Sequence, residues 1–215
     1  MDLIVRHYLP SDQPAVFEIS AESAFFGEPV EAFLEDRQLY NDAFAKYYTE
    51  FETSLVWVAE SPQGVIGFLL GCADTAIQLK RWRKYIVTTV LLNSISGKYK
   101  LGKRTTRFAL GMLAGSVRRE APPVNLSEYP AHLQIDVKQG CRGMGIGRLL
   151  IEAYLEQLRE LHVHGVHLET TSHNEQACHL YENIGFQQLD ERVNRYWTHM
   201  LGFLVKNRSY GMKLD

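Results

Sequence analysis

Strict alternation of apolar and polar residues predicts a strand with two different faces in the second half of the chain. The segment AHLQIDVK, residues 131–138, places apolar side chains at its odd positions and polar side chains at its even positions. This period of two is typical of a half-buried strand. Shorter apolar stretches bounded by turn residues predict further strands at 3–8, 54–60, 65–73 and 166–171, and near 186–192 and 209–214.

Helical periodicity separates these strands. From Ile146 to residue 163 the apolar residues recur every three or four positions, and the charged residues fall on the other faces. Similar patterns predict helices at 12–26, 30–51 and 175–184. Together the elements predict an α/β (α+β) fold with a mixed, mostly antiparallel twisted sheet and helices on both of its faces.

Composition restricts the class of protein. The chain has 215 residues, of which 46% are hydrophobic, and this is enough for one core, so we expect a single domain over 1–215. Its three scattered cysteines argue against a disulfide framework and for a reducing compartment, the cytoplasm. The N-terminus carries early charges and no long apolar run, which argues against a signal peptide or a membrane span.

The segment at about 75–125 differs from the rest in charge. Between Lys80 and Arg119 there are eleven Lys and Arg residues and no Asp or Glu. Its apolar residues predict two short helices around the turn SGKYKLGKR, so we expect an ordered insertion between the third and fourth strands. It could be a solvated helical lid, or it could attract acidic ligands; nucleic acid and a membrane surface are less favoured partners.

Three glycines at alternate positions, Gly143, Gly145 and Gly147, stand directly between the strand at 131–138 and the helix at 146–163. Glycines expose the backbone, and the start of a helix adds unpaired N–H groups and the positive end of its dipole. A strand, a glycine turn and a helix in this order predict a binding site for a phosphate group.

Two common phosphate-binding motifs do not fit this turn. The dinucleotide motif needs a third glycine where Leu150 stands, and the nucleoside-triphosphate motif needs Lys and Ser or Thr after its last glycine, where Arg148 and Leu149 stand. The segment from Arg142 to Gly147 instead resembles the Gln/Arg-x-x-Gly-x-Gly/Ala motif of the GCN5-related N-acetyltransferase (GNAT) family.

A second segment strengthens this resemblance. NEQACHLYENIGF, residues 174–186, is similar to the family's Asn-x-x-Ala-x-x-x-Tyr-x-x-x-Gly-Phe segment and follows the glycine turn at the expected distance. The close resemblance covers about 129–189, and YPAHLQID is similar to bacterial members akin to the acetyltransferase-like domains fused to some hexosaminidases. The insertion at 75–125 matches nothing in the family.

The resemblance implies roles for particular residues. Acetyl-coenzyme A would be the co-substrate, with its pantetheine arm in a gap between the splayed strands at 131 and 166, beside the main chain of Ile135 and Val137. Asn174 would cap its helix and contact the same arm. The pyrophosphate would lie on the glycine turn, held by Arg142, Gly143, Met144, Gly145, Ile146, Gly147 and Arg148.

The reaction that the resemblance implies needs two proton transfers. An alkylamine with a pKa near 10.4 is almost fully protonated at pH 7, and its deprotonation costs roughly 4.6 kcal/mol. Asp136, His132 and Glu169 are candidate bases, with Asp136 preferred, and the family's acid position falls on Tyr181. Two of these residues have structural alternatives: Tyr181 could be a packing tyrosine with its hydroxyl in water, and Asp136 could cap or pair with a base of the insertion.

The sequence thus predicts an N-acetyltransferase that acts on a primary amine by direct attack in a ternary complex, with a small amine or aminosugar favoured over a protein lysine. The alternative is a non-catalytic acyl-coenzyme A sensor whose basic insertion binds an anionic partner. We expect a monomer or homodimer without a metal, since the histidines at 162–173 lie in different elements. The family's proline before the glycine turn is replaced by Gln139 and Gly140, which predicts a looser entry to the turn.

Overall fold

The computed structural model describes residues 3–214, which form a seven-stranded sheet in the order β1-β2-β3-β4-β5-β7-β6. Neighbouring strands are antiparallel except for β4 and β5, which are parallel. The predicted mixed, mostly antiparallel sheet is therefore confirmed. The strands are β1 (Ile4–His7), β2 (Val56–Ser61), β3 (Gly64–Cys72), β4 (Ala131–Val137), β5 (Gly165–Thr171), β6 (Gln187–Val193) and β7 (Lys206–Lys213).

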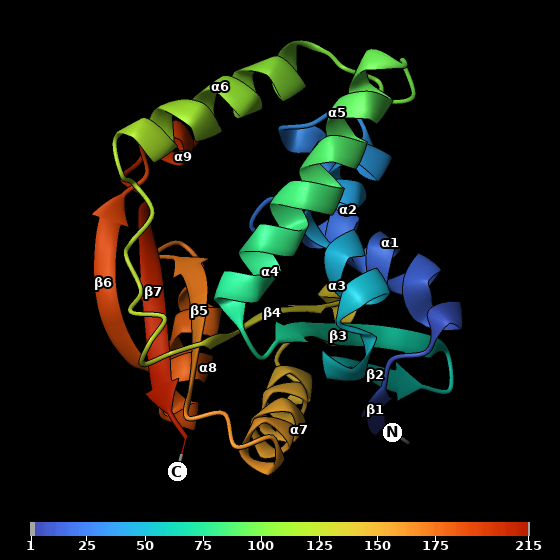
Figure 1. Ribbon diagram of the computed structural model, residues 1–215, viewed down its shortest axis with the longest axis vertical. Helices are drawn as coiled ribbons and strands as arrows, with labels where there is room; N and C mark the ends of the chain where they lie inside the picture. The colour runs from blue at the N-terminus through green and yellow to red at the C-terminus, as the bar shows by residue number, and fades with distance from the viewer. Residues whose placement is uncertain (1–2, 215) are drawn as a thin grey trace.

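Helices cover both faces of this sheet, as Figure 1 shows. On one face α7 (Ile146–Glu160) packs on β2, β3 and β4, and α8 (Glu175–Ile184) shares the same core with β5 and β7. On the other face α1 (Gln13–Ser23) and α3 (Lys46–Phe51) lie over β2 and β3, and α2 (Arg37–Phe44) packs against α1 and α3. One apolar core lies on each side of the sheet, because strand side chains alternate between its faces. A third, smaller core lies between α1, α2 and the insertion and includes Leu39 and Tyr99.

The structure corrects two of the predicted elements. The helix expected over 30–51 is a short 3₁₀ turn followed by α2 and α3, because the Asp36 side chain accepts the Leu39 N–H and starts a new helix there. Near the C-terminus the chain forms a helix that no local pattern predicted, α9 (Arg195–Leu201), which Asn194 caps in the same way. β7 begins at Lys206 rather than near 209.

The insertion between β3 and β4 is helical, as predicted, but its first helix is longer than expected. It begins after Asp74 and runs without interruption through α4 (Thr75–Arg81), a π-helical stretch (Trp82–Val87) and α5 (Thr88–Ile95). After the predicted turn, α6 (Lys103–Val117) runs across the top of the molecule in Figure 1 toward α9. The insertion is attached to the body by Trp82, which donates to Ala43 O at 2.8 Å, and by Tyr99, which donates to Asp42 at 2.6 Å.

The parallel strands β4 and β5 pair at only two positions, Ala131 with Val166 and His132 with His167. Beyond His132 the strands separate, while β4 remains paired with β3 up to Val137. We call the position where the pairing ends, at His132 and His167, the branch point. The buried Tyr154 of α7 lies beneath it, and the Tyr154 hydroxyl donates to both Cys72 O and His132 O, each 2.9 Å away. The expected gap between splayed strands is therefore present, and it determines where a ligand can enter the sheet.

Candidate active site

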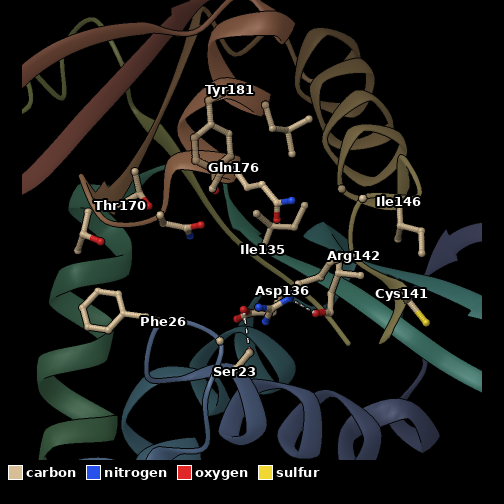
Figure 2. Close-up of a pocket in the computed structure, with 18 of the residues that line it drawn as sticks. Ser23, Phe26, Ile135, Asp136, Cys141, Arg142, Ile146, Thr170, Gln176 and Tyr181 are labelled. Carbon is tan, nitrogen blue, oxygen red and sulfur yellow. Dashed lines mark hydrogen bonds between the residues drawn. The ribbon is translucent and has the colours of Figure 1, made fainter. Parts of the chain in front are cut away.

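A cavity of about 590 Å³ occupies the open end of the gap between β4 and β5. Its walls come from segments that are distant in sequence: α1, the ends of β4 and β5, the glycine turn, α8 and α9. Figure 2 shows Tyr181 on one side of this cavity and Asp136 with Ser23 on the other, with Ile135 between them. The volume falls within the range of small-molecule and cofactor sites in proteins.

The glycine turn has the backbone that its sequence predicted. Gly143 and Gly145 have φ angles of +76° and +80°, a left-handed region that residues with a Cβ atom disfavour. The first intrahelical bond of α7 runs from Leu149 N–H to Gly145 O, so the N–H groups of the three preceding residues lie outside the helical ladder. Because Gly145, Ile146 and Gly147 line the cavity, these donors lie at its edge.

Two arginines flank this turn. Arg142 lines the cavity and donates through Nε to Val137 O at 3.0 Å, which ties the turn back to the end of β4. Arg148 also lines the cavity and forms an exposed ion pair with Glu152 at 3.1 Å. The side chain of Met144 is half exposed and lies outside the cavity lining, so only its main chain is left for the predicted role.

Asp136 is enclosed by protein but reaches the cavity. Its Oδ1 accepts a hydrogen bond from the Ser23 hydroxyl of α1 at 2.8 Å. Burial raises the pKa of Asp136 to about 6, although the Ser23 hydrogen bond and the charge of Arg142 oppose this rise. Asp136 therefore pairs with no base of the insertion, and its carboxyl group titrates close to neutral pH, as a general base should.

Tyr181 faces Asp136 from the other side of the gap. Its ring packs in the α7–α8 core, 6.0 Å from the ring of Tyr210, and the residue lines the cavity. Burial, and to a smaller extent the negative charge of Asp136, raises the pKa of the Tyr181 phenol above its usual value. The phenol is thus fully protonated at neutral pH and can donate a hydrogen bond into the cavity.

Asn174 precedes α8 and lines the cavity, but the structure corrects its predicted capping role. Its main-chain N–H bonds to Thr171 O at 3.1 Å, whereas its side chain makes no cap hydrogen bond. The Asn174 side chain is consequently left for a ligand. Ile135 and Val137 also line the cavity, where β4 has lost β5 as its neighbour.

A second cavity, of about 470 Å³, adjoins the paired end of the gap beneath the insertion. We call it the inner cleft; its walls include Phe44, Trp82, His132, Gln134 and Glu169. Since the register aligns His132 with His167, Gln134 and Glu169 lie level with each other on the two strands. Asp136 is two residues farther along β4, on the same face as Gln134.

The three candidate bases, Asp136, His132 and Glu169, have different surroundings in the structure. His132 has both ring nitrogens engaged, Nδ1 with Thr75 Oγ1 at 2.9 Å and Nε2 with Tyr48 Oη at 2.6 Å. Burial lowers its pKa to about 3, so His132 is a structural residue and not a base for the reaction. Glu169 is exposed to the inner cleft, and desolvation by the cleft walls raises its pKa.

Several cavity residues were not foreseen from the sequence. Ser23, Phe26, Tyr40, Gln176 and Trp197 line the cavity from α1, the loop after it, α2, α8 and α9. No local pattern marks these residues, because each reaches the cavity through the packing of its own element. Only Gln176 lies inside a segment that carried a motif.

Within residues 3–214 no group of three or more His, Cys, Asp and Glu side chains is arranged to hold a metal ion. Over the same residues, no helix combines the length and the apolar character needed to cross a bilayer.

Solved structures with the same fold include several acetyltransferases. "SsHAT" is 27% identical with a TM-score of 0.76, and the match covers all of both chains. YncA, a putative acetyltransferase from Salmonella typhimurium solved with its cofactor acetyl-CoA, is 15% identical with a TM-score of 0.59, over 100% of this chain and 95% of that one. A GNAT superfamily phosphinothricin acetyltransferase from Sinorhizobium meliloti, in complex with AcCoA, is 14% identical with a TM-score of 0.58, over 100% and 90% of the two chains.

Sequence comparison agrees with the fold. The model of the acetyltransferase (GNAT) family matches residues 15–186, which include α1, the whole insertion, the glycine turn and the end of α8. The chain therefore belongs to the acetyltransferase (GNAT) family.

Proposed function

We propose that the protein is an N-acetyltransferase that transfers the acetyl group of acetyl-coenzyme A directly to a primary amine. The observation that carries this proposal is the arrangement of the cavity, in which a turn of open N–H groups leads to a gap between Asp136 and Tyr181. A site for a phosphate and a pair of proton-handling groups meet in one cavity, as acyl transfer from a coenzyme requires.

The coenzyme end of the site is formed by the glycine turn. The main-chain N–H groups at 143–148 would bind the pyrophosphate, with Arg142 and Arg148 adding positive charge. Ile135 and Val137 of β4 would offer main-chain groups to the pantetheine arm, and Asn174 would offer its side-chain amide. These residues would place the thioester in the gap between the two strands.

Asp136 and Tyr181 would divide the proton transfers. With a pKa of about 6, Asp136 is mostly ionised at pH 7 and can accept a proton from the attacking amine. Because burial raises the pKa of Tyr181 above that of a thiol, its phenol would stabilise the departing sulfur by donating a hydrogen bond while keeping most of its proton. The N–H group of Val137 could serve the developing oxyanion.

The inner cleft would receive the acceptor. Its wall residues Gln134 and Glu169 are the chain neighbours of Ile135 and Thr170, which line the first cavity, and the start of the insertion, with Leu79 and Trp82, forms part of its wall. One carboxylate in a largely apolar cleft is complementary to a small cationic molecule. A small amine or an aminosugar fits this size and charge better than an extended protein segment.

A second candidate function is a sensor that binds acyl-coenzyme A without turnover and contacts an anionic partner. The eleven bases of the insertion favour this alternative. The two functions differ in thiol release from acetyl-coenzyme A over a panel of amines and aminosugars. Release above background supports the transferase, whereas tight coenzyme binding with no release from any acceptor supports the sensor.

The glycine turn can be tested with two valine variants of equal backbone strain. Gly145 and Gly97 have φ angles of +80° and +73°, and a Cβ atom at either position would meet open space. G145V should weaken coenzyme A binding at least tenfold, because it changes the N–H cradle, whereas G97V in the α5–α6 turn should bind normally. Isothermal titration calorimetry measures both, and equal affinity of the two variants would contradict a coenzyme site at this turn.

Replacing Tyr181 tests the acid side of the reaction. Y181F should lower kcat by about 10²-fold, because the departing sulfur loses its hydrogen-bond donor, while the Kd of coenzyme A changes little. The matched control is Y210F, which removes the hydroxyl of a neighbouring buried tyrosine that bonds to Glu182 at 3.0 Å. Steady-state kinetics that show the same kcat for Y181F and the unchanged protein would remove Tyr181 from the reaction.

The base can be tested by its titration. Asp136 has a raised pKa and acts in its ionised form, so kcat/KM should fall as the pH drops through about 6. S23A removes a hydrogen bond that lowers this pKa, and the acid limb should therefore move to higher pH. pH profiles of the two proteins measure the shift. An acid limb that stays in place in S23A, or that persists in D136N, would assign the limb to another group.

Acceptor binding can be tested at Glu169. E169Q should raise KM for cationic amines about 10- to 100-fold, since a hydrogen bond to a charged group is lost, and should leave kcat at saturation within about threefold. The control is E160Q at the exposed end of α7, which is far from the inner cleft. If E169Q lowers kcat instead and leaves KM unchanged, Glu169 acts on the proton and does not bind the acceptor.

A further inference from the structure

The insertion carries exposed apolar side chains that do not pack in the core of the protein. Neither α5 nor α6 contains a buried residue. On α6, Leu110, Leu113 and Val117 are 61%, 63% and 78% exposed, and Ile95 at the end of α5 is 84% exposed. Lone exposed apolar residues are ordinary on protein surfaces, but Leu110, Leu113 and Val117 share one helix face and form a stripe.

This stripe lies on a different face of α6 from the one that packs. Phe108 contacts Phe33, with ring centroids 4.8 Å apart, and a Cβ atom at Gly111 would lie 2.3 Å from Tyr196 of α9. These residues attach α6 to the body. Positions 103, 107, 110, 113 and 117 follow one another by three or four residues along the helix and form a separate face. We call this face, Lys103, Arg107, Leu110, Leu113 and Val117, the outer stripe.

The outer stripe belongs to a segment whose bases are mostly unpaired within the described chain. Of the eleven bases between residues 80 and 119, three form ion pairs with acids of the described chain: Arg81 with Glu52, Arg104 with Glu35 and Arg118 with Glu120. The other eight have no such partner within residues 3–214: Lys80, Arg83, Lys84, Lys98, Lys100, Lys103, Arg107 and Arg119. Lys103 and Arg107 belong to the stripe itself, so apolar and basic groups share one helix face.

We propose that the insertion binds the surface of an anionic lipid bilayer, with the outer stripe of α6 at the interface between headgroups and acyl chains. A helix that presents leucines and bases together satisfies both parts of such a surface, since the leucines enter the apolar boundary and the bases meet the anionic headgroups. This proposal goes beyond the acetyltransferase function and does not depend on it.

Charge and hydrophobicity together disfavour two other partners. A second copy of this chain on the same stripe would bring like charges together without acids to neutralise them, because the segment from Lys80 to Arg119 contains no Asp or Glu. A nucleic acid would use the bases through its phosphates but would leave the leucines in water. A bilayer with anionic headgroups is complementary to both kinds of side chain.

Vesicle cosedimentation of the full-length protein tests this proposal. Binding to vesicles of phosphatidylcholine and phosphatidylserine at 7:3 should be at least tenfold stronger than binding to phosphatidylcholine alone. Each base near an anionic surface contributes about fivefold, so K103E/R107E should lose at least tenfold of that binding. The apolar variant L110S/L113S should lose at least tenfold as well, because its side chains no longer enter the boundary.

The matched control changes one base and one exposed leucine elsewhere, R159E/L161S at the end of α7, and should bind like the unchanged protein. Circular dichroism melting of every variant separates lost binding from lost folding. Equal binding to the two kinds of vesicle, or binding that L110S/L113S leaves unchanged, would overturn the proposal. So would a dimer in analytical ultracentrifugation that L110S/L113S dissociates, or RNA binding in place of vesicle binding.

Discussion

The early end of the pairing between β4 and β5 is the constraint on which the site depends. A continuous ladder between these strands would close the sheet, and Asp136 and Tyr181 would then be separated by backbone. Because pairing stops at His132 and His167, the remaining main-chain groups of β4 on that side face a cavity. Hydrogen-bonding groups of this kind need partners, and an extended ligand arm can supply them. The fold thus creates a binding site by leaving one strand pair incomplete.

The branch point is held from below by α7. Tyr154 is fully buried, and a Cβ atom at Gly71 would lie 2.4 Å from its ring, so α7 packs closely against β3. The helix that supplies the N–H groups of the glycine turn is therefore the same helix that holds the branch point in place. One helix therefore positions both the glycine turn and the end of the β4–β5 pairing.

The insertion has two structurally different parts. Its first turns, with Trp82 and the buried Ile86, pack on α2 and α3 and form a wall of the inner cleft. Its later part, from α5 to Arg119, adds little to the core and carries five of the eight bases that form no ion pair within residues 3–214. A segment that contributes little to stability and concentrates bases and exposed leucines is better explained by a contact outside the chain. The insertion thus presents two separate surfaces: its first turns line the inner cleft, and its later part faces away from the core.

The sequence alone determined the elements whose signals are local. Alternation identified β4, periodicity identified α7, and the two motifs that contain the glycines, Asn174 and Tyr181 identified the family. Local signals also misled where a cap decided the outcome: Asp36 divides the helix expected over 30–51, and Asn194 starts α9, which was missed.

Only the tertiary structure decided which residues share the cavity and in which direction their pKa values shift. Burial raises the pKa of Asp136, and Ser23, which lies 113 positions earlier in the chain, donates the hydrogen bond that opposes this rise. His132 and Asp136 share one face of β4. Thr75 and Tyr48 occupy both ring nitrogens of His132, whereas the carboxyl group of Asp136 reaches the cavity. The physical reason is that burial and hydrogen bonding depend on neighbours that distant segments bring, and no pattern within a short stretch of sequence encodes them.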